Sequence, residues 1–246
     1  MFYNFLNKNY QGWDNQYEFV INNIKNNIPF CYVRFNDGEM MGIDKIGSVV
    51  ARGDQVVDEK LHNKLKEAIT YKSDNYYIGI PCKNCFPYYN NLANELIGDY
   101  QYKVSAVALT NRNWLKFIQE CVGLLSEKKI HYISGSDQTI DILINYFKFN
   151  IVNQIKVNNF NSWANYDELT EYVNKVEDGD IVLISLGPTA RILCYEFFKK
   201  NNKATFIDVG SIFDPFTRNV RHNCHKGWEN GFNMTKRCEI CNWYGI

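Results

Sequence analysis

The amino-acid sequence predicts an α/β fold of Rossmann-like type, with a mostly parallel sheet that carries helices on both faces, followed by an irregular C-terminal tail. The first observation is a set of short apolar runs typical of buried strands, at residues 30–35, 76–80, 104–109, 130–134, 151–157, 181–186 and 204–209. The second is the helical spacing of apolar residues between most of these runs, most clearly at residues 61–69, 114–121 and 140–147. Strands that alternate with helices form a parallel sheet that is buried on both faces.

The alternation of strands and helices also divides the chain. Residues 1–215 are expected to form one domain around the sheet. From Asp214 onward the alternation stops and Arg, His, Cys, Trp and Gly accumulate, which predicts an irregular appendage at residues 216–246. In open α/β sheets, ligands bind beyond the carboxyl ends of the strands, where loops and helix N-termini meet. The residues that follow each apolar run are therefore the candidates for a functional site.

The composition narrows the class of protein. The chain has 246 residues, of which 46% are hydrophobic, and this is enough to bury a large core. Basic and acidic residues are equal at 27 each, so the overall charge favours neither nucleic acid nor an anionic membrane. No apolar run reaches the roughly 20 residues of a membrane-spanning helix, and residues 1–9 lack the features of a signal peptide. A cytoplasmic protein is expected, and homo-oligomer formation is left open.

The densest group of polar residues follows the first apolar run. Arg34, Asp37 and Glu39 place a guanidinium and two carboxylates within six residues, and we expect them on a polar loop at the end of a strand. Two carboxylates separated by Gly38 can turn toward one cation, and the arginine can pair with a carboxylate or bind a phosphate. The alternative is a surface turn, because Asp-Gly is common in turns.

A second candidate site follows the sixth apolar run. Gly187 predicts a turn, Pro188 suits the first position of a helix, and Ser185 or Thr189 is suited to cap that helix. The N-terminus of such a helix binds anions, and Arg191 adds positive charge. The alternative is an ordinary turn between a strand and a helix, since the segment has no P-loop lysine and no repeated glycines.

The third candidate is Asp208, which ends the last apolar run and is followed by Gly210 and Asp214. An aspartate at this position binds a ribose hydroxyl, accepts a proton or caps the following turn.

Together the three segments resemble the GT-D glycosyltransferases, a family first catalogued as a domain of unknown function. That family carries an Arg-Phe-x-Asp-Gly-Glu segment, matched here by residues 34–39, and a Ser-Leu-Gly-Pro-Thr-Ala segment, matched by residues 185–190. It also carries an Asp-(Ile or Val)-Gly segment, matched by residues 208–210. The resemblance implies that Asp37 and Glu39 bind Mn²⁺ or Mg²⁺ together with the donor diphosphate.

The resemblance further implies a metal-dependent hexosyltransferase that moves a sugar from a UDP-sugar donor to a glycan or a protein-linked acceptor. Asp208, Asp214 and Glu39 are all candidates for a catalytic base, and a retaining reaction can proceed without one. The other residues implied at the donor site are Arg34, Phe35, Asn36, Gly38, Ser185, Gly187, Pro188, Thr189, Arg191 and Gly210. Two other functions are kept open: a metal-dependent hydrolase of nucleotide sugars or phosphodiesters, and an interaction module stabilised by zinc.

The tail contains residues that bind zinc in other proteins. Cys238 and Cys241 form a Cys-x-x-Cys pair, and Cys224 and His225 precede it by about a dozen residues, a spacing typical of structural Zn²⁺ sites. The rival partners are Cys82 and Cys85, which would give a site of four cysteines. The alternative is a set of reduced or redox-active thiols.

The remaining cysteines and histidines are expected to be structural. Cys31, Cys121 and Cys194 lie in apolar segments and are expected to be reduced thiols of the core. His62 is expected on the exposed side of a helix, and His131 in a strand with its hydrogen bonds satisfied.

Overall fold

The computed structural model describes residues 15–50, 55–110, 113–158 and 161–219. Its centre is a seven-stranded sheet in the order β5-β4-β1-β9-β8-β6-β7, in which all neighbouring strands are parallel. The strands are β1 Cys31–Arg34, β4 Tyr76–Ile80, β5 Lys103–Ser105, β6 Lys129–Gly135, β7 Asn150–Val157, β8 Ile181–Ser185 and β9 Thr205–Asp208. Each predicted run overlaps one of these strands, so the predicted parallel α/β fold is confirmed.

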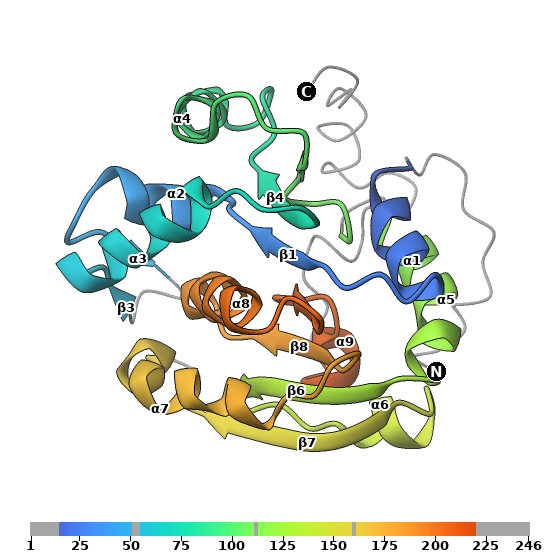
Figure 1. Cartoon of the computed structure of the whole chain (residues 1–246). Helices are drawn as coiled ribbons and strands as arrows, with labels where there is room; N and C mark the ends of the chain where they lie inside the picture. Colours follow the sequence, from blue (N-terminus) through green and yellow to red (C-terminus); the bar gives the residue numbers. More distant parts are fainter. Residues whose placement is uncertain (1–14, 51–54, 111–112, 159–160, 220–246) are drawn as a thin grey trace.

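Helices cover both faces of the sheet (Figure 1). One face packs against α2 Asp37–Asp44, α3 Glu59–Thr70, α4 Pro87–Ile97, α7 Tyr166–Glu171 and α8 Pro188–Lys200. The other face packs against α1 Glu18–Lys25, α5 Trp114–Leu125, α6 Asp141–Asn145 and α9 Asp214–Thr217. The short 3-10 helices are η1 Asn15–Tyr17, η3 Ser162–Asn165 and η4 Tyr172–Lys175, and a small antiparallel hairpin joins β2 Val49–Val50 to β3 Gln55–Val56.

Helix α8 is the central helix of its layer. It packs on β1, β8 and β9 and lies between α3 and α7 (Figure 1). Its first ten residues are buried apart from the partly exposed Glu196, including the polar Thr189 and Arg191. A helix buried on nearly all sides belongs to the core. The start of α8 is therefore held rigidly at the carboxyl end of the sheet.

Three local predictions are corrected by the structure. Asp37 and Glu39 lie in the first turn of α2 and not on a loop. Asp214 begins the short helix α9, so the irregular tail does not start there. The apolar run at residues 104–109 is strand only through Ser105, because the chain then turns and Ala106 offers its carbonyl to Arg34.

The two described histidines are both buried. His62 was expected on an exposed face, but its Nδ1 lies 3.0 Å from the carbonyl oxygen of Gly42 in α2. His131 in β6 has its hydrogen bonds satisfied, as expected: Nδ1 lies 2.8 Å from the Tyr172 hydroxyl and Nε2 lies 2.9 Å from Asp180 Oδ2. This network lies at the amino end of β6 and β8, opposite the edge where ligands bind in such sheets.

Within the part of the chain that the structure describes, no helix combines the length and the apolar character needed to cross a lipid bilayer.

The His131 network leads to a prediction about stability. Tyr172→Phe removes the hydroxyl and leaves the buried Nδ1 of His131 with only the longer contact to Asn153 Nδ2 at 3.5 Å, so we expect the free energy of unfolding to fall by about 1–3 kcal/mol. Urea denaturation of the purified protein measures this change.

Tyr88→Phe is the matched control. The Tyr88 hydroxyl also bonds a partner, Asp44 Oδ1 at 2.8 Å, but the side chain is 60% exposed. Its loss is expected to change the unfolding free energy by less than about 0.5 kcal/mol. Equal effects of the two variants would show that the His131 network adds no particular stability.

Candidate functional site

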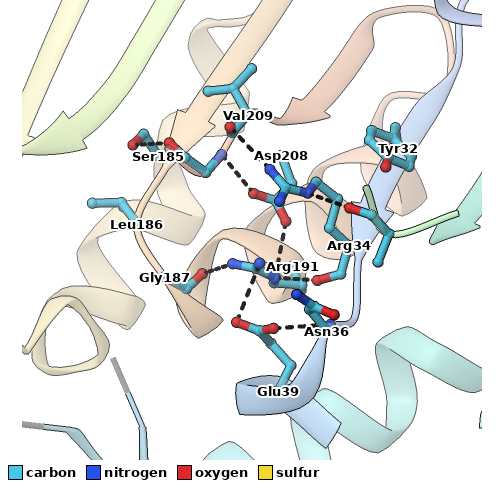
Figure 2. A network of polar contacts seen from close by, with 12 residues as sticks. Tyr32, Arg34, Asn36, Glu39, Ser185, Leu186, Gly187, Arg191, Asp208 and Val209 are labelled. Atoms are coloured by element: carbon cyan, nitrogen blue, oxygen red, sulfur yellow. Dashed lines mark hydrogen bonds and ion pairs between the residues drawn. The ribbon is translucent and has the colours of Figure 1, made fainter. Parts of the chain in front are cut away.

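The candidate site lies where the order of the strands reverses. From β1 the chain adds β4 and β5 on one side, and the later strands β6 to β9 fill the other side, so that β9 lies between β1 and β8. In open parallel sheets, the carboxyl edge at such a reversal is where ligands bind. The three segments selected from the sequence follow β1, β8 and β9, and the structure brings them together there (Figure 2).

Glu39 connects the first of these segments to the second. It occupies the third position of α2, and its Oε2 accepts a hydrogen bond from the backbone nitrogen of Asn36 at 3.1 Å. Its Oε1 lies 3.2 Å from Nη2 of Arg191 in α8. Both carboxylate oxygens are therefore occupied by protein groups, and the residue is only 8% exposed.

Arg191 contacts all three segments with one guanidinium group. Its Nε donates to the carbonyl oxygen of Arg34 at 2.6 Å, and its Nη1 donates to the carbonyl oxygen of Gly187. Its Nε also lies 2.9 Å from Asp208 Oδ2. Because Arg191 is 5% exposed and surrounded by acceptors, it faces the interior in this structure.

Arg34 also points inward. Its Nε donates to the carbonyl oxygen of Ala106 at 2.9 Å, and its Nη1 donates to that of Val209 at 3.2 Å. Gly210 makes room for this side chain: it has a φ of +47°, and a Cβ added there would lie 2.8 Å from Arg34 Nη1. The guanidinium thus fixes two loops at the edge of the sheet.

Asp208 lies beneath the surface of the site, with an exposure of 0%. Its Oδ1 accepts a hydrogen bond from the Gly210 nitrogen at 3.0 Å. Its Oδ2 accepts no hydrogen bond, because the Arg191 Nε–H points toward the Arg34 carbonyl, so this contact is ionic only. Burial raises the pKa of the Asp208 carboxyl, and the positive charges of Arg191 and Arg34 oppose that rise.

The start of α8 presents the positive end of a helix dipole, where Pro188 has no N–H group and the Ala190 N–H donates to the Gly187 carbonyl oxygen at 3.1 Å. Gly187 is exposed, has a φ of +52° and precedes Pro188, and no side chain caps this end of the helix. Thr189 is buried, and its Oγ1 lies 2.9 Å from the Ser162 hydroxyl of η3. The unsatisfied N–H groups of a helix start attract anions.

Ser185, at the end of β8, joins this strand to the loop that follows β9. Its hydroxyl donates to the Gly210 carbonyl at 2.6 Å and accepts from Gln138 Nε2 at 2.8 Å. Ser162 and Gln138 carry no recognisable signal in the sequence, so sequence reasoning did not find them.

Asp37 differs from the other acidic residues of the site because it is exposed, at the first position of α2. Among the described residues, no three His, Cys, Asp or Glu side chains gather into a metal site. Mg²⁺ is commonly held by one or two carboxylates together with phosphate oxygens and water. Asp37 is the carboxylate of this site that is accessible to such a cation, whereas Glu39, two residues later on the same helix, uses both oxygens in protein contacts.

The cysteines fall into two groups. Cys31, Cys121 and Cys194 are buried in the core as predicted, and burial raises the pKa of all three thiols, so they stay protonated at neutral pH. Cys82 and Cys85 are partly buried in the turn between β4 and α4. The predicted ligands Cys224, His225, Cys238 and Cys241 lie outside the described residues.

Known structures share the fold. One, described as the highly conserved domain of unknown function 1792 with a distinct glycosyltransferase fold, is 19% identical, with a TM-score of 0.65 over 88% of each chain. Another, described as a new glycosyltransferase from Streptococcus sanguinis, is 16% identical, with a TM-score of 0.66 over 84% of this chain and 85% of that one. No curated protein matches the sequence.

The family comparison agrees with the three segments. The sequence model of the glycosyltransferase GT-D fold matches residues 88–226, which is more than half of the chain. This region includes Arg191 and Asp208, and residues 34–39 lie before it but join it through the ion pair of Glu39 with Arg191. The chain therefore belongs to the glycosyltransferase GT-D fold family.

Proposed function

We propose that this protein is a metal-dependent glycosyltransferase that moves a hexose from a UDP-sugar to a glycan or a protein-linked acceptor. The observation that carries the proposal is the meeting of two helix starts, α2 and α8, whose first turns are joined by Glu39 and Arg191 at 3.2 Å. Both helix dipoles direct their positive ends toward this edge of the sheet. A diphosphate is an anion that such a site would bind.

The charges of the site support binding of an anion together with a cation. The buried charges of Arg34, Arg191, Glu39 and Asp208 balance one another, and Asp37 adds an exposed negative charge beside the two helix starts. Asp37 would hold Mn²⁺ or Mg²⁺, and Glu39 would serve as a second ligand by exchanging one of its protein contacts for the cation. The cation supplies stabilisation of the negative charge that develops on the departing nucleoside diphosphate.

The three carboxylates considered as catalytic bases all contact arginines. Glu39 and Asp208 contact Arg191, and Asp214 Oδ2 lies 3.4 Å from Arg218 Nη1. A base has to reach the proton that it removes. These contacts favour a reaction in which the protein mainly orients the donor and stabilises the leaving group.

The alternative function is hydrolysis of the nucleotide sugar. Formation of a glycosylated acceptor indicates transfer, whereas formation of free hexose alone indicates hydrolysis.

We also propose that the cysteine-rich tail binds a structural Zn²⁺ ion, separate from the exchangeable cation at Asp37. Thiolates are the preferred ligands of such sites. The buried thiols of the core do not suit this role, because their pKa is raised. Cys238 and Cys241 would therefore be joined by Cys224 and His225, or by Cys82 and Cys85.

The two carboxylates of α2 lead to a prediction that separates their contributions. Asp37→Asn is expected to weaken Mn²⁺ binding in the presence of UDP by more than about tenfold, with a stability change of less than about 0.5 kcal/mol. Glu39→Gln is also expected to weaken Mn²⁺ binding in the presence of UDP. In addition it should lower the free energy of unfolding by about 2 kcal/mol, because Arg191 loses a charged partner.

Titration calorimetry and urea denaturation measure these two effects. Asp44→Asn, in the last turn of the same helix, is the control and is expected to keep wild-type Mn²⁺ affinity. If Asp37→Asn binds Mn²⁺ and UDP as the wild type does, the cation site is assigned wrongly.

Gly187 provides a prediction about the diphosphate. Gly187→Val places a branched side chain at an exposed helix start with positive φ, and we expect UDP affinity to fall at least about tenfold. Gly179→Val is the control: Gly179 is also exposed, has a φ of +85° and lies beside the amino end of β8. Both variants should lose similar stability, and only the first should lose affinity. Equal UDP affinities would exclude the start of α8 from the site.

The zinc proposal is tested by elemental analysis of protein purified without chelators. We expect about one zinc per chain, and Cys238→Ser should abolish it with either set of ligands. Cys82→Ser should abolish it only if the site has four cysteines. Absence of zinc together with reactive Cys238 and Cys241 thiols would refute the proposal.

A further inference from the structure

Asp208 ends the strand at the centre of the site, yet it cannot meet a substrate in this structure. Its exposure is 0%, and Arg191 lies against Oδ2 while the Gly210 nitrogen occupies Oδ1. A general base lies within hydrogen-bonding distance of the proton that it accepts, directly or through one water molecule. Both oxygens of Asp208 instead face groups of the protein.

Arg191 is the residue through which Asp208 can act. Its guanidinium contacts Arg34 at the end of β1, Gly187 at the start of α8 and Glu39 in the first turn of α2. One planar group therefore determines how the two helix starts lie relative to each other. A buried guanidinium needs a negative partner to remain charged and in place, and the fully buried Asp208 provides one at 2.9 Å.

We infer that Asp208 is a positioning residue: its ion pair with Arg191 sets the relative position of the α2 and α8 helix starts, and thereby the affinity for the nucleoside diphosphate. The inference rests on the proposed function. It assigns Asp208 a role other than that of a catalytic base.

The geometry allows the ionic contact to be removed without changing the shape of the site. Asp208 Oδ2 accepts no hydrogen bond, whereas Oδ1 accepts one from Gly210. In Asp208→Asn the amide oxygen can keep the Gly210 hydrogen bond, and the charge opposite Arg191 disappears. Arg34 continues to hold the same loop through the Val209 carbonyl. The amide NH₂ then stands where Oδ2 was and faces the Arg191 guanidinium, which is also a donor, so the variant disrupts the Asp208–Arg191 pair while the Gly210 hydrogen bond is kept.

The experiment measures UDP binding in the presence of Mn²⁺ by calorimetry for the wild type, Asp208→Asn, Arg191→Lys and the double variant. Each single variant is expected to bind UDP about tenfold more weakly. The double variant should bind within about twofold of the weaker single variant, because the two residues act as a pair. A second measurement is the steady-state hydrolysis of a UDP-hexose. Asp208→Asn should raise KM, and kcat should still fall at low pH as it does in the wild type, because that fall would disappear only if Asp208 were the base.

Asp180→Asn is the matched control. Asp180 is also a buried aspartate with an ionisable partner, His131 at 2.9 Å, but it lies at the amino edge of the sheet. The Asp180→Asn variant is expected to be less stable than the wild type and to bind UDP with the same affinity. This separates positioning from a general loss of stability.

The possible results exclude one another. One result would identify Asp208 as a base and show that the inference is wrong. In that case Asp208→Asn binds UDP as the wild type does, its kcat is about a hundredfold lower, and kcat no longer falls at low pH. If Asp208→Asn does not fold, unchanged UDP affinity of Arg191→Lys overturns the inference. Wild-type protein that binds no UDP with Mn²⁺ contradicts the proposed function itself, whereas wild-type binding with unaffected variants contradicts only this inference.

Discussion

The Arg191 guanidinium is the group on which the arrangement of the site depends. It joins the carbonyl oxygen of Arg34, 157 positions earlier in the chain, to the carboxylate of Asp208 and to Glu39. The buried guanidinium groups of Arg191 and Arg34 balance the two carboxylates, and any one of these four charges would be costly to bury alone. The carboxyl edge of the sheet is thus stabilised by a neutral network whose members come from distant parts of the sequence.

The order of the strands makes this network possible. Because β9 lies between β1 and β8, the last strand of the sheet ends next to the first, and α8 crosses above all three. Gly210 completes the arrangement, since any side chain there would collide with Arg34. The site is therefore a consequence of how the sheet is assembled.

The sequence predicts most of the fold because each central strand is a continuous apolar run, and such runs are easily recognised. It does not reveal α2, whose residues show no apolar stripe, although Asn36 followed three positions later by Glu39 is a recognised signal of a helix start. The segments of the site could be selected, because they follow strands. The inward direction of the Arg34 and Arg191 side chains could not be predicted from the sequence, because it depends on carbonyl groups and partners that sequence spacing does not identify.

The network of His131, Tyr172 and Asp180 has a consequence for adaptation of the protein. It lies at the amino edge of the sheet, and the groups of the candidate site lie at the carboxyl edge, beyond β1, β8 and β9. Substitutions at one edge can adjust resistance to heat while the other edge continues under selection for chemistry. The length of β8 thus separates a buried stabilising network from the candidate site, so that the residues of the two regions can change independently in evolution.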